Sequence, residues 1–157
     1  MSDQDLLRDS QDRTRGAVPN AGVGLRPNDT IATFLDGQAT LMRLRPIIDK
    51  RGSLLPLGFS QLPFLPHHVF LIKDVPVGAR GRSRNDGFRL LVRVAGSIRI
   101  EMQASDLVSQ CVLDRTDAVL LIGPGVSTTH TYLEARAILL VLAASPCEPS
   151  EFLMDPG

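Results

Sequence analysis

A short stretch late in the chain carries side chains suited to acid–base chemistry. Thr128, His130 and Tyr132 alternate along it, so in an extended strand all three side chains lie on one face. Histidine titrates near neutral pH and suits general acid or base work, and tyrosine can donate a hydrogen bond to a developing oxyanion. We therefore take His130 and Tyr132 as candidate catalytic residues and Thr128 as a candidate substrate contact. A purely structural, hydrogen-bonded histidine is the competing interpretation.

A run of arginines in the middle of the chain indicates a ligand that carries negative charge. Six arginines stand within 20 residues, accompanied by the single acidic residue Asp86: Arg80, Arg82, Arg84, Arg89, Arg93 and Arg99. A guanidinium group offers planar, paired donors to carboxylate, phosphate or enolate oxygens. Strand alternation turns at least half of the run to solvent. We take Arg82, Arg84, Arg89 and Arg93 as candidate binding residues, and which of them face a cavity stays open.

The elements that must position these residues are short strands. From residue 31 onward, apolar and alternating segments are separated by turn residues such as Asp36-Gly37 and Gly123-Pro124-Gly125. The expected strands cover residues 31–35, 40–44, 53–59, 68–73, 88–95, 97–103, 108–113, 118–122, 128–133 and 137–143. Many short strands at near-regular spacing predict an all-β sandwich or barrel. Residues 1–28 are polar and lack periodicity, so we expect a flexible tail followed by one domain over residues 29–157.

Composition excludes several classes of function. The formal net charge is zero and aromatic residues make up 4% of the chain, which disfavours a nucleic-acid partner. No apolar run reaches the ~18 residues of a membrane span, and we see no signal-peptide pattern. We therefore expect a cytoplasmic protein that contacts neither membrane nor nucleic acid. The two cysteines, Cys111 and Cys147, lack the close spacing of a zinc site.

Five segments of the chain resemble one family in order and spacing. They are Ile48-Asp-Lys-Arg-Gly-Ser-Leu54, Val69-Phe-Leu-Ile-Lys-Asp-Val-Pro76, Val94-Ala-Gly-Ser97, Leu121-Ile-Gly-Pro124 and Ile138-Leu-Leu-Val-Leu-Ala-Ala-Ser145. The set resembles the cupin family of dTDP-sugar 3,4-ketoisomerases, which move a keto group along a nucleotide-linked deoxysugar. The resemblance implies a single cupin (jelly-roll) β-barrel. It also implies a homodimer, since family members often exchange an N-terminal strand.

The chain departs from this family where its chemistry resides. The family carries an Arg-Gly-x-His-x-His stretch whose histidines transfer protons, and here that stretch is Arg80-Gly-Arg-Ser-Arg-Asn85. Against the wider cupin metal motif, the chain shows Arg82, Arg84 and Arg89 at the ligand positions. A guanidinium group has no free lone pair for a metal. We therefore expect neither a metal nor another cofactor.

The resemblance also implies where the remaining candidates lie. If Thr128 occupies the position of the second-motif cupin histidine, His130 and Tyr132 look into the barrel, opposite the strand that carries Arg89 and Arg93. Related nucleotide-sugar cupins use an arginine in the Asp-x-Arg-Gly turn to contact phosphates. Arg51 stands in that turn and is a candidate binding residue, with an ion pair to its neighbour Asp49 as the equal alternative.

These observations predict a small-molecule enzyme. Our main hypothesis is a metal-free isomerase or cyclase, pericyclic catalysis included, that rearranges one small anionic or polar metabolite in natural-product biosynthesis. Such a reaction needs a shaped cavity and one or two groups that stabilise shifting charge. One alternative is a dTDP-4-keto-6-deoxyhexose 3,4-ketoisomerase with a relocated base. Another is a cupin that binds a small molecule without catalysis.

Overall fold

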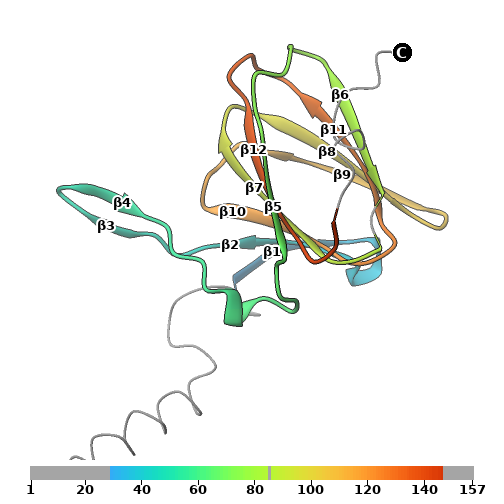
Figure 1. Ribbon diagram of the computed structural model, residues 1–157, viewed down its shortest axis with the longest axis horizontal. Coiled ribbons are helices and arrows are strands. Elements are labelled where there is room, and N and C mark those ends of the chain that lie inside the picture. Colours follow the sequence, from blue (N-terminus) through green and yellow to red (C-terminus); the bar gives the residue numbers. More distant parts are fainter. Residues whose placement is uncertain (1–28, 85, 147–157) are drawn as a thin grey trace, which may run out of the picture.

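The computed structural model describes residues 29–84 and 86–146 as a nearly all-β domain (Figure 1). The expected tail over residues 1–28 lies outside the described residues. Two 3₁₀ turns, Leu35–Gly37 and Phe59–Gln61, accompany the strands. The strands are β1 Thr30–Phe34, β2 Ala39–Arg43, β3 Ile47–Asp49, β4 Gly52–Leu54, β5 His68–Ile72, β6 Arg80–Arg84, β7 Arg89–Ala95, β8 Ile98–Ala104, β9 Leu107–Leu113, β10 Ala118–Ile122, β11 Ser127–Tyr132 and β12 Ile138–Ala143.

The strands form two antiparallel sheets that pack face to face, plus one separate hairpin. The larger sheet has six strands in the order β1-β2-β10-β7-β12-β5, and the smaller has four in the order β6-β11-β8-β9. The hairpin of β3 and β4 extends away from both sheets (Figure 1). Among the described residues no hydrogen-bonded strand pair joins the two sheets, so they form an open sandwich of a barrel-like shape. The prediction of an all-β domain of short strands is confirmed.

The main core lies between the two sheets and follows directly from strand alternation. Along β8 the side chains of Ile98, Ile100 and Met102 are buried while those between them are more exposed. Leu91 of β7 and Leu120 of β10 meet them from the larger sheet. Side chains at every second position thus fill the space between two facing sheets, as expected for a β-sandwich.

The larger sheet is apolar on its other face as well. Leu90, Val92, Val119 and Leu142 point away from the main core and form a second cluster, covered by side chains of the segment 55–64. The central strands of this sheet are therefore buried on both faces. This explains why β10 and β12 consist of nearly unbroken aliphatic runs instead of alternating ones.

Two strands, β3 and β6, were missing from the sequence prediction. The arginine-rich β6 lacks the apolar residues that mark a strand, yet it pairs with β11 in regular register, with Ser83 opposite Thr128. The expected strand over residues 53–59 was too long, because β4 ends at Leu54 and the chain continues through an irregular segment. Tertiary pairing therefore determines strand formation here more than local composition does.

Gly96 is the glycine that the fold requires most strictly. It turns the chain between β7 and β8 with φ +72°, and a Cβ atom placed there would lie 2.6 Å from the Cα of Ala137. A side chain would therefore meet both backbone strain and a backbone clash. Gly125 has a similar φ of +84° but no heavy atom within 4 Å of the same added Cβ.

We predict that Gly96→Ala lowers the free energy of unfolding by about 3 kcal/mol or more, because a left-handed alanine costs ~1–2 kcal/mol and overpacking adds ~1–3 kcal/mol. The matched control Gly125→Ala carries the strain without the clash and should lose only about 1–2 kcal/mol. Urea unfolding of the three proteins measures the difference. Equal losses in the two variants would contradict the clash.

Candidate functional site

Among the described residues, four polar or charged side chains are buried between the sheets, and we call them the core cluster. They are Ser83 of β6, Arg89 of β7, and Thr128 and His130 of β11. Arg89 and His130 are 0% exposed, and the two hydroxyl residues are 2% exposed. Arg89 reaches from the larger sheet to the other three on the smaller sheet. The core cluster therefore ties the two sheets together.

Arg89 is held by hydrogen bonds that point its guanidinium group at β6 and β11. Its Nη1 donates to Ser83 Oγ at 2.6 Å and to Thr128 Oγ1 at 3.2 Å, and its Nη2 donates to the Val126 carbonyl at 2.8 Å. A charge removed from water is tolerated only when its donors are satisfied in this way. The result is a fixed positive charge inside the domain.

His130 lies next to this charge and is neutral under physiological conditions. Its Nε2 is 3.0 Å from Thr128 Oγ1. Burial first and the positive charge of Arg89 second lower the pKa of His130 from 6.5 to about 3. A group with so low a pKa is a weak base at neutral pH. The expectation that His130 could act as the general base is therefore disfavoured, and a neutral imidazole that donates a hydrogen bond is the role its surroundings suit.

Tyr132 follows two residues later on the same face of β11. The side chain is 1% exposed, and its hydroxyl has no hydrogen-bond partner among the described residues. Burial raises the pKa of Tyr132, so the phenol keeps its proton. A buried hydroxyl without a partner is unfavourable by ~1–3 kcal/mol. Groups of this kind call for an explanation, and hydrogen bonding to a ligand is one.

The sequence of β11 dictates which side chains enter the domain. Thr128, His130 and Tyr132 are buried, whereas Ser127, Thr129 and Thr131 are half-buried on the opposite face. The strand therefore has the single-face arrangement that the alternation predicted. Its inward face also lies opposite the strand that carries Arg89, as the resemblance implied.

Arg82 and Arg84 do not join the core cluster. Both are exposed, and the inward positions of β6 are Gly81 and Ser83. The expectation that arginines occupy three metal-ligand positions is therefore wrong for these two. The physical reason is that a shift of one residue along a strand moves every side chain to the other face.

Ser83 is the core-cluster residue that the sequence analysis missed. A signal was present, since Ser83 stands where the Arg-Gly-x-His-x-His stretch of the resembling family has its first histidine. The structure places this side chain inside the domain, hydrogen-bonded to Arg89. Ser83 at this position accepts a hydrogen bond from Arg89.

Arg93 and Arg51 also lie apart from the core cluster. Arg93 shares the inward face of β7 but lies four residues, or about 13 Å, farther along the strand. There it donates to the Gly96 carbonyl and to Thr116 Oγ1 at 3.0 Å, so it clamps two turns. Arg51 lies in the turn between β3 and β4, far from the core cluster, and its Nη2 is 2.6 Å from Asp49 Oδ2.

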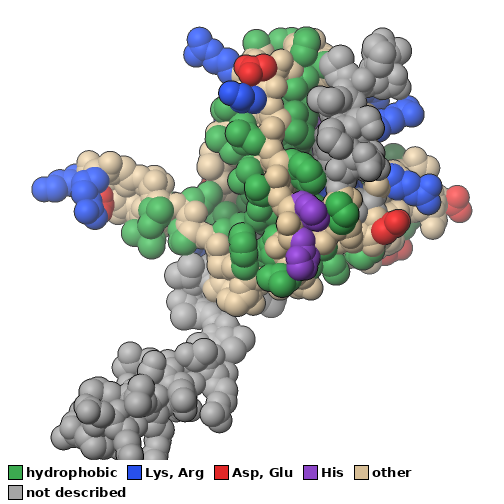
Figure 2. All heavy atoms as spheres, in the orientation of Figure 1, with side chains coloured by type: hydrophobic (Ala, Val, Ile, Leu, Met, Phe, Trp, Pro, Cys, Tyr) green, Lys and Arg blue, Asp and Glu red, His purple; other side chains and the backbone are tan. Residues whose placement is uncertain are grey.

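The ion pair of Arg51 and Asp49 is exposed to solvent at the tip of the hairpin. The side-chain hydrogen bond lowers the pKa of Asp49 and raises the pKa of Arg51. Basic side chains gather at this tip (Figure 2). The structure thus has the ion pair that the sequence left as an equal alternative to a phosphate contact. Exposed pairs of this kind contribute little to stability.

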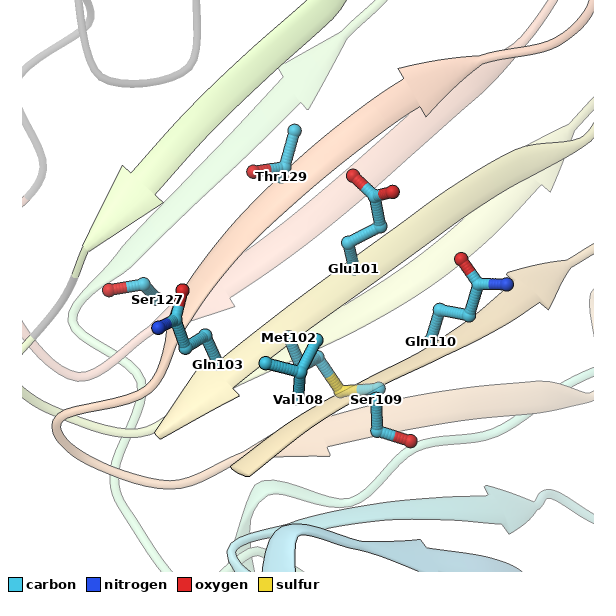
Figure 3. A pocket seen from close by; sticks show the side chains of 8 residues that line it. All are labelled: Glu101, Met102, Gln103, Val108, Ser109, Gln110, Ser127 and Thr129. Atoms are coloured by element: carbon cyan, nitrogen blue, oxygen red, sulfur yellow. The ribbon is translucent and has the colours of Figure 1, made fainter. Parts of the chain in front are cut away.

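Two of the surface hollows are lined by described residues. One of about 370 Å³ lies on β8, β9 and β11 and is lined by Glu101, Met102, Gln103, Val108, Ser109, Gln110, Ser127 and Thr129 (Figure 3). The other, of about 250 Å³, lies at the hairpin and includes Arg51. Neither is lined by a residue of the core cluster.

The core cluster does not fit a divalent cation. His130 is its single imidazole, and the Arg89 guanidinium has no lone pair and would repel a positive ion. Over residues 29–84 and 86–146, no three histidine, cysteine, aspartate or glutamate side chains gather as metal ligands. Within the same residues, no helix is long and apolar enough to cross a membrane.

Comparison with known proteins gives a consistent set of similarities. A family model described as "FdtA: WxcM-like, C-terminal" matches residues 37–157. A TDP-4-oxo-6-deoxy-alpha-D-glucose-3,4-oxoisomerase of Aneurinibacillus thermoaerophilus is 24% identical over 118 residues, which span 72% of this chain and 84% of that protein.

Two solved structures are similar in both fold and sequence. The WlaRB TDP-quinovose 3,4-ketoisomerase of Campylobacter jejuni has a TM-score of 0.66 and 27% identity, over 74% of this chain and 92% of that one. A mutant of the 3,4-ketoisomerase QdtA of Thermoanaerobacterium thermosaccharolyticum, in complex with TDP-4-keto-6-deoxyglucose, has a TM-score of 0.65 and 25% identity, over 75% of this chain and 88% of that one.

The pKa of His130 predicts how stability depends on pH. Between about pH 6.5 and pH 3 the unfolded chain protonates this histidine while the folded protein does not. Acid therefore favours unfolding in this window, and the free energy of unfolding should fall by up to about 1.4 kcal/mol per pH unit. We expect His130→Gln to remove this contribution to the slope between pH 6 and pH 5. Chemical unfolding at each pH measures it.

The exposed His67 provides the control. The variant His67→Gln should keep the slope of the unaltered protein. An unchanged slope in His130→Gln would show that His130 already takes up its proton in the folded state near neutral pH.

Proposed function

The chain belongs to the family described as "FdtA: WxcM-like, C-terminal", and from that premise we propose that it is a metal-free isomerase that rearranges one small polar or anionic metabolite. The relatives named above are 3,4-ketoisomerases, so a nucleotide-linked keto-deoxysugar is the first substrate to consider. A polyketide-type substrate in natural-product biosynthesis is the second. In either case reactant and product are isomers, and no co-reactant is consumed.

The observation that carries this proposal is the buried hydroxyl of Tyr132, which has no hydrogen-bond partner within the described part of the chain, beside a neutral His130. The two residues lie on one face of β11, about 7 Å apart along the strand. Arg89 adds a fixed positive charge on the opposite sheet. All three groups favour negative charge on a nearby oxygen, so they suit a reaction in which a carbonyl oxygen gains charge.

The same groups decide which rearrangements are favoured. A 3,4-ketoisomerisation of a 4-keto sugar removes the proton from C3 and forms an enediol. A proton is then returned to C4, the former carbonyl carbon, while the C3 hydroxyl loses its proton and becomes the new carbonyl. That route needs a base, and the low pKa of His130 makes it a poor one. A rearrangement within one bound conformer needs shape and charge stabilisation but no enzyme base. We therefore place the cyclase or pericyclic type of reaction ahead of the ketoisomerase with a relocated base.

An assay with a dTDP-4-keto-6-deoxyhexose separates these alternatives. The purified protein is incubated with the sugar nucleotide and the product is followed by NMR. Appearance of the 3-keto isomer assigns the ketoisomerase reaction, and its persistence in His130→Gln would show that the reaction does not use this site. Binding without conversion directs the search to other substrates of similar polarity.

We predict that Tyr132→Phe separates activity from stability. Removal of an unpartnered buried hydroxyl should leave the free energy of unfolding unchanged or raise it by up to about 1 kcal/mol. Loss of an oxyanion donor should lower kcat by about 10²–10³-fold. Thr131→Val, on the outer face of the same strand, is the control and should retain activity. Full turnover by Tyr132→Phe would show that the Tyr132 hydroxyl takes no part in the reaction.

A non-catalytic binding protein is the second candidate function. It is favoured by the observation that three hydrogen bonds of the Arg89 guanidinium go to protein groups, which suits a structural role. If this candidate is correct, calorimetry detects binding of TDP or a TDP-sugar, and no product forms at any substrate concentration. The His130→Gln variant should then bind the same ligand as tightly as the unaltered protein does.

We also propose that the protein is a homodimer. The six residues of β3 and β4 are all exposed, and Ile47, Ile48 and Leu54 present large aliphatic side chains on them. A lone two-stranded hairpin is marginally stable in water. The larger sheet exposes a second apolar surface at Val69 and Leu71 of β5. A two-fold axis would give each copy both a donor and an acceptor surface.

This proposal predicts that Ile48→Asp weakens self-association by at least tenfold, since a charge would be buried in an apolar contact at a cost of more than about 1.4 kcal/mol. Val108→Asp, on the outer face of β9, is matched in exposure, at 72% against 71%, and should have no effect. Analytical ultracentrifugation over a range of concentrations measures both. A monomer at all concentrations, or equal weakening by the two variants, contradicts the hairpin contact.

A further inference from the structure

Thr128 has more hydrogen-bonding neighbours than its single proton can serve. Its Oγ1 lies 3.2 Å from Arg89 Nη1, 3.0 Å from His130 Nε2 and 3.4 Å from the Ser83 carbonyl oxygen. A hydroxyl group has one proton to donate and two lone pairs that accept. The directions of these three contacts can therefore be worked out one at a time.

Arg89 fixes the first direction. A guanidinium group only donates, so Nη1 takes one lone pair of Thr128 Oγ1. The same Nη1 is 2.6 Å from Ser83 Oγ, and Nη2 is 2.8 Å from the Val126 carbonyl. With the guanidinium held from these sides, the donation to Thr128 does not depend on a mobile side chain.

The remaining distances fix the second direction. Hydrogen bonds donated by a hydroxyl group are usually 2.5–3.0 Å long between oxygens, so a contact of 3.4 Å to the Ser83 carbonyl is a weak acceptor position. His130 Nε2 at 3.0 Å is the nearer acceptor. The positive charge of Arg89 also directs the hydroxyl proton away from the guanidinium, which leaves His130 Nε2 and the Ser83 carbonyl as its acceptors, of which Nε2 is the nearer.

We propose that Thr128 is a positioning residue that donates its hydroxyl proton to His130 Nε2 and so holds His130 in the Nδ1–H tautomer. A neutral imidazole carries one proton, so an accepting Nε2 places that proton on Nδ1. The low pKa of His130 supports the neutral form. Arg89, Thr128 and His130 then form a one-way chain of donors.

The tautomer of His130 limits which ligands the site would favour. This consequence rests on the proposed function. With Nε2 accepting from Thr128, Nδ1 of His130 is a donor and not an acceptor. Together with the Tyr132 hydroxyl, this donor character favours substrates that present oxygen acceptors, such as a carbonyl or an enolate oxygen. Substrates that need a base at this position would be turned over poorly.

The tautomer can be measured by ¹⁵N NMR of the full-length protein labelled at its three histidines. Protonated and unprotonated imidazole nitrogens have well-separated shifts, and His130→Gln identifies the signals of His130 by their loss. We expect a protonated Nδ1 and an unprotonated Nε2 at neutral pH. A protonated Nε2 in the unaltered protein overturns the proposal without any variant.

Variants of Thr128 test whether this residue sets the tautomer. Thr128→Val keeps the side-chain shape and removes the donor, so the ratio of Nδ1–H to Nε2–H should fall about tenfold, as expected for loss of one buried hydrogen bond. Thr128→Ser should restore the ratio, and Thr131→Val should leave it unchanged. An unaltered ratio in Thr128→Val would show that another group fixes the proton.

The two proposals fail independently. The NMR experiment uses no substrate, so an Nδ1–H tautomer without conversion of the dTDP-4-keto-6-deoxyhexose would keep the role of Thr128 and reject the ketoisomerase reaction. Turnover with an Nε2–H tautomer would keep the isomerase and reject the role of Thr128.

Discussion

A buried guanidinium group constrains the interior of this protein. The Arg89 charge cannot be neutralised at any physiological pH, so the chain must supply acceptors around it. It does so from the side of the smaller sheet, with the Ser83 and Thr128 hydroxyls and the Val126 carbonyl. The same charge acts on His130 and helps to keep it neutral. The electrostatics of the core cluster therefore follow from one residue on β7.

The two sheets contribute differently to this arrangement. The larger sheet is apolar on both faces and supplies a rigid wall from which Arg89 projects. In the smaller sheet, β8 points apolar side chains inward and more polar ones outward, and β11 places hydroxyl and imidazole groups inward beside them. A buried polar site needs an apolar wall that excludes water and inward polar groups in fixed positions. Fixed dipoles act strongly only when water is excluded.

Much of this organisation could be predicted from the sequence, and the errors concern strand register and contacts between distant segments. The resemblance to cupin 3,4-ketoisomerases and the all-β fold are confirmed by the family model and the similar structures. Alternation placed Thr128, His130 and Tyr132 on one face because β11 has a regular pattern. Arg82 and Arg84 were misplaced because an arginine-rich strand has no apolar residues to fix its register, and a slip of one position exchanged them with Ser83. The hydrogen bonds of Arg93 and the pKa of His130 depend on contacts between distant segments, which no local pattern encodes.

The outward arginines of β6 have a consequence for how the protein behaves among its own copies. β6 is an edge strand of the smaller sheet, and Arg80, Arg82 and Arg84 project from its outer face at every second position. Edge strands are the places where sheets of neighbouring molecules extend into fibrils, and charged side chains suppress such growth. Two β6 edges that approach each other would align like charges along their length. The three outward arginines of β6 therefore oppose edge-to-edge growth of this chain, whose net charge is zero.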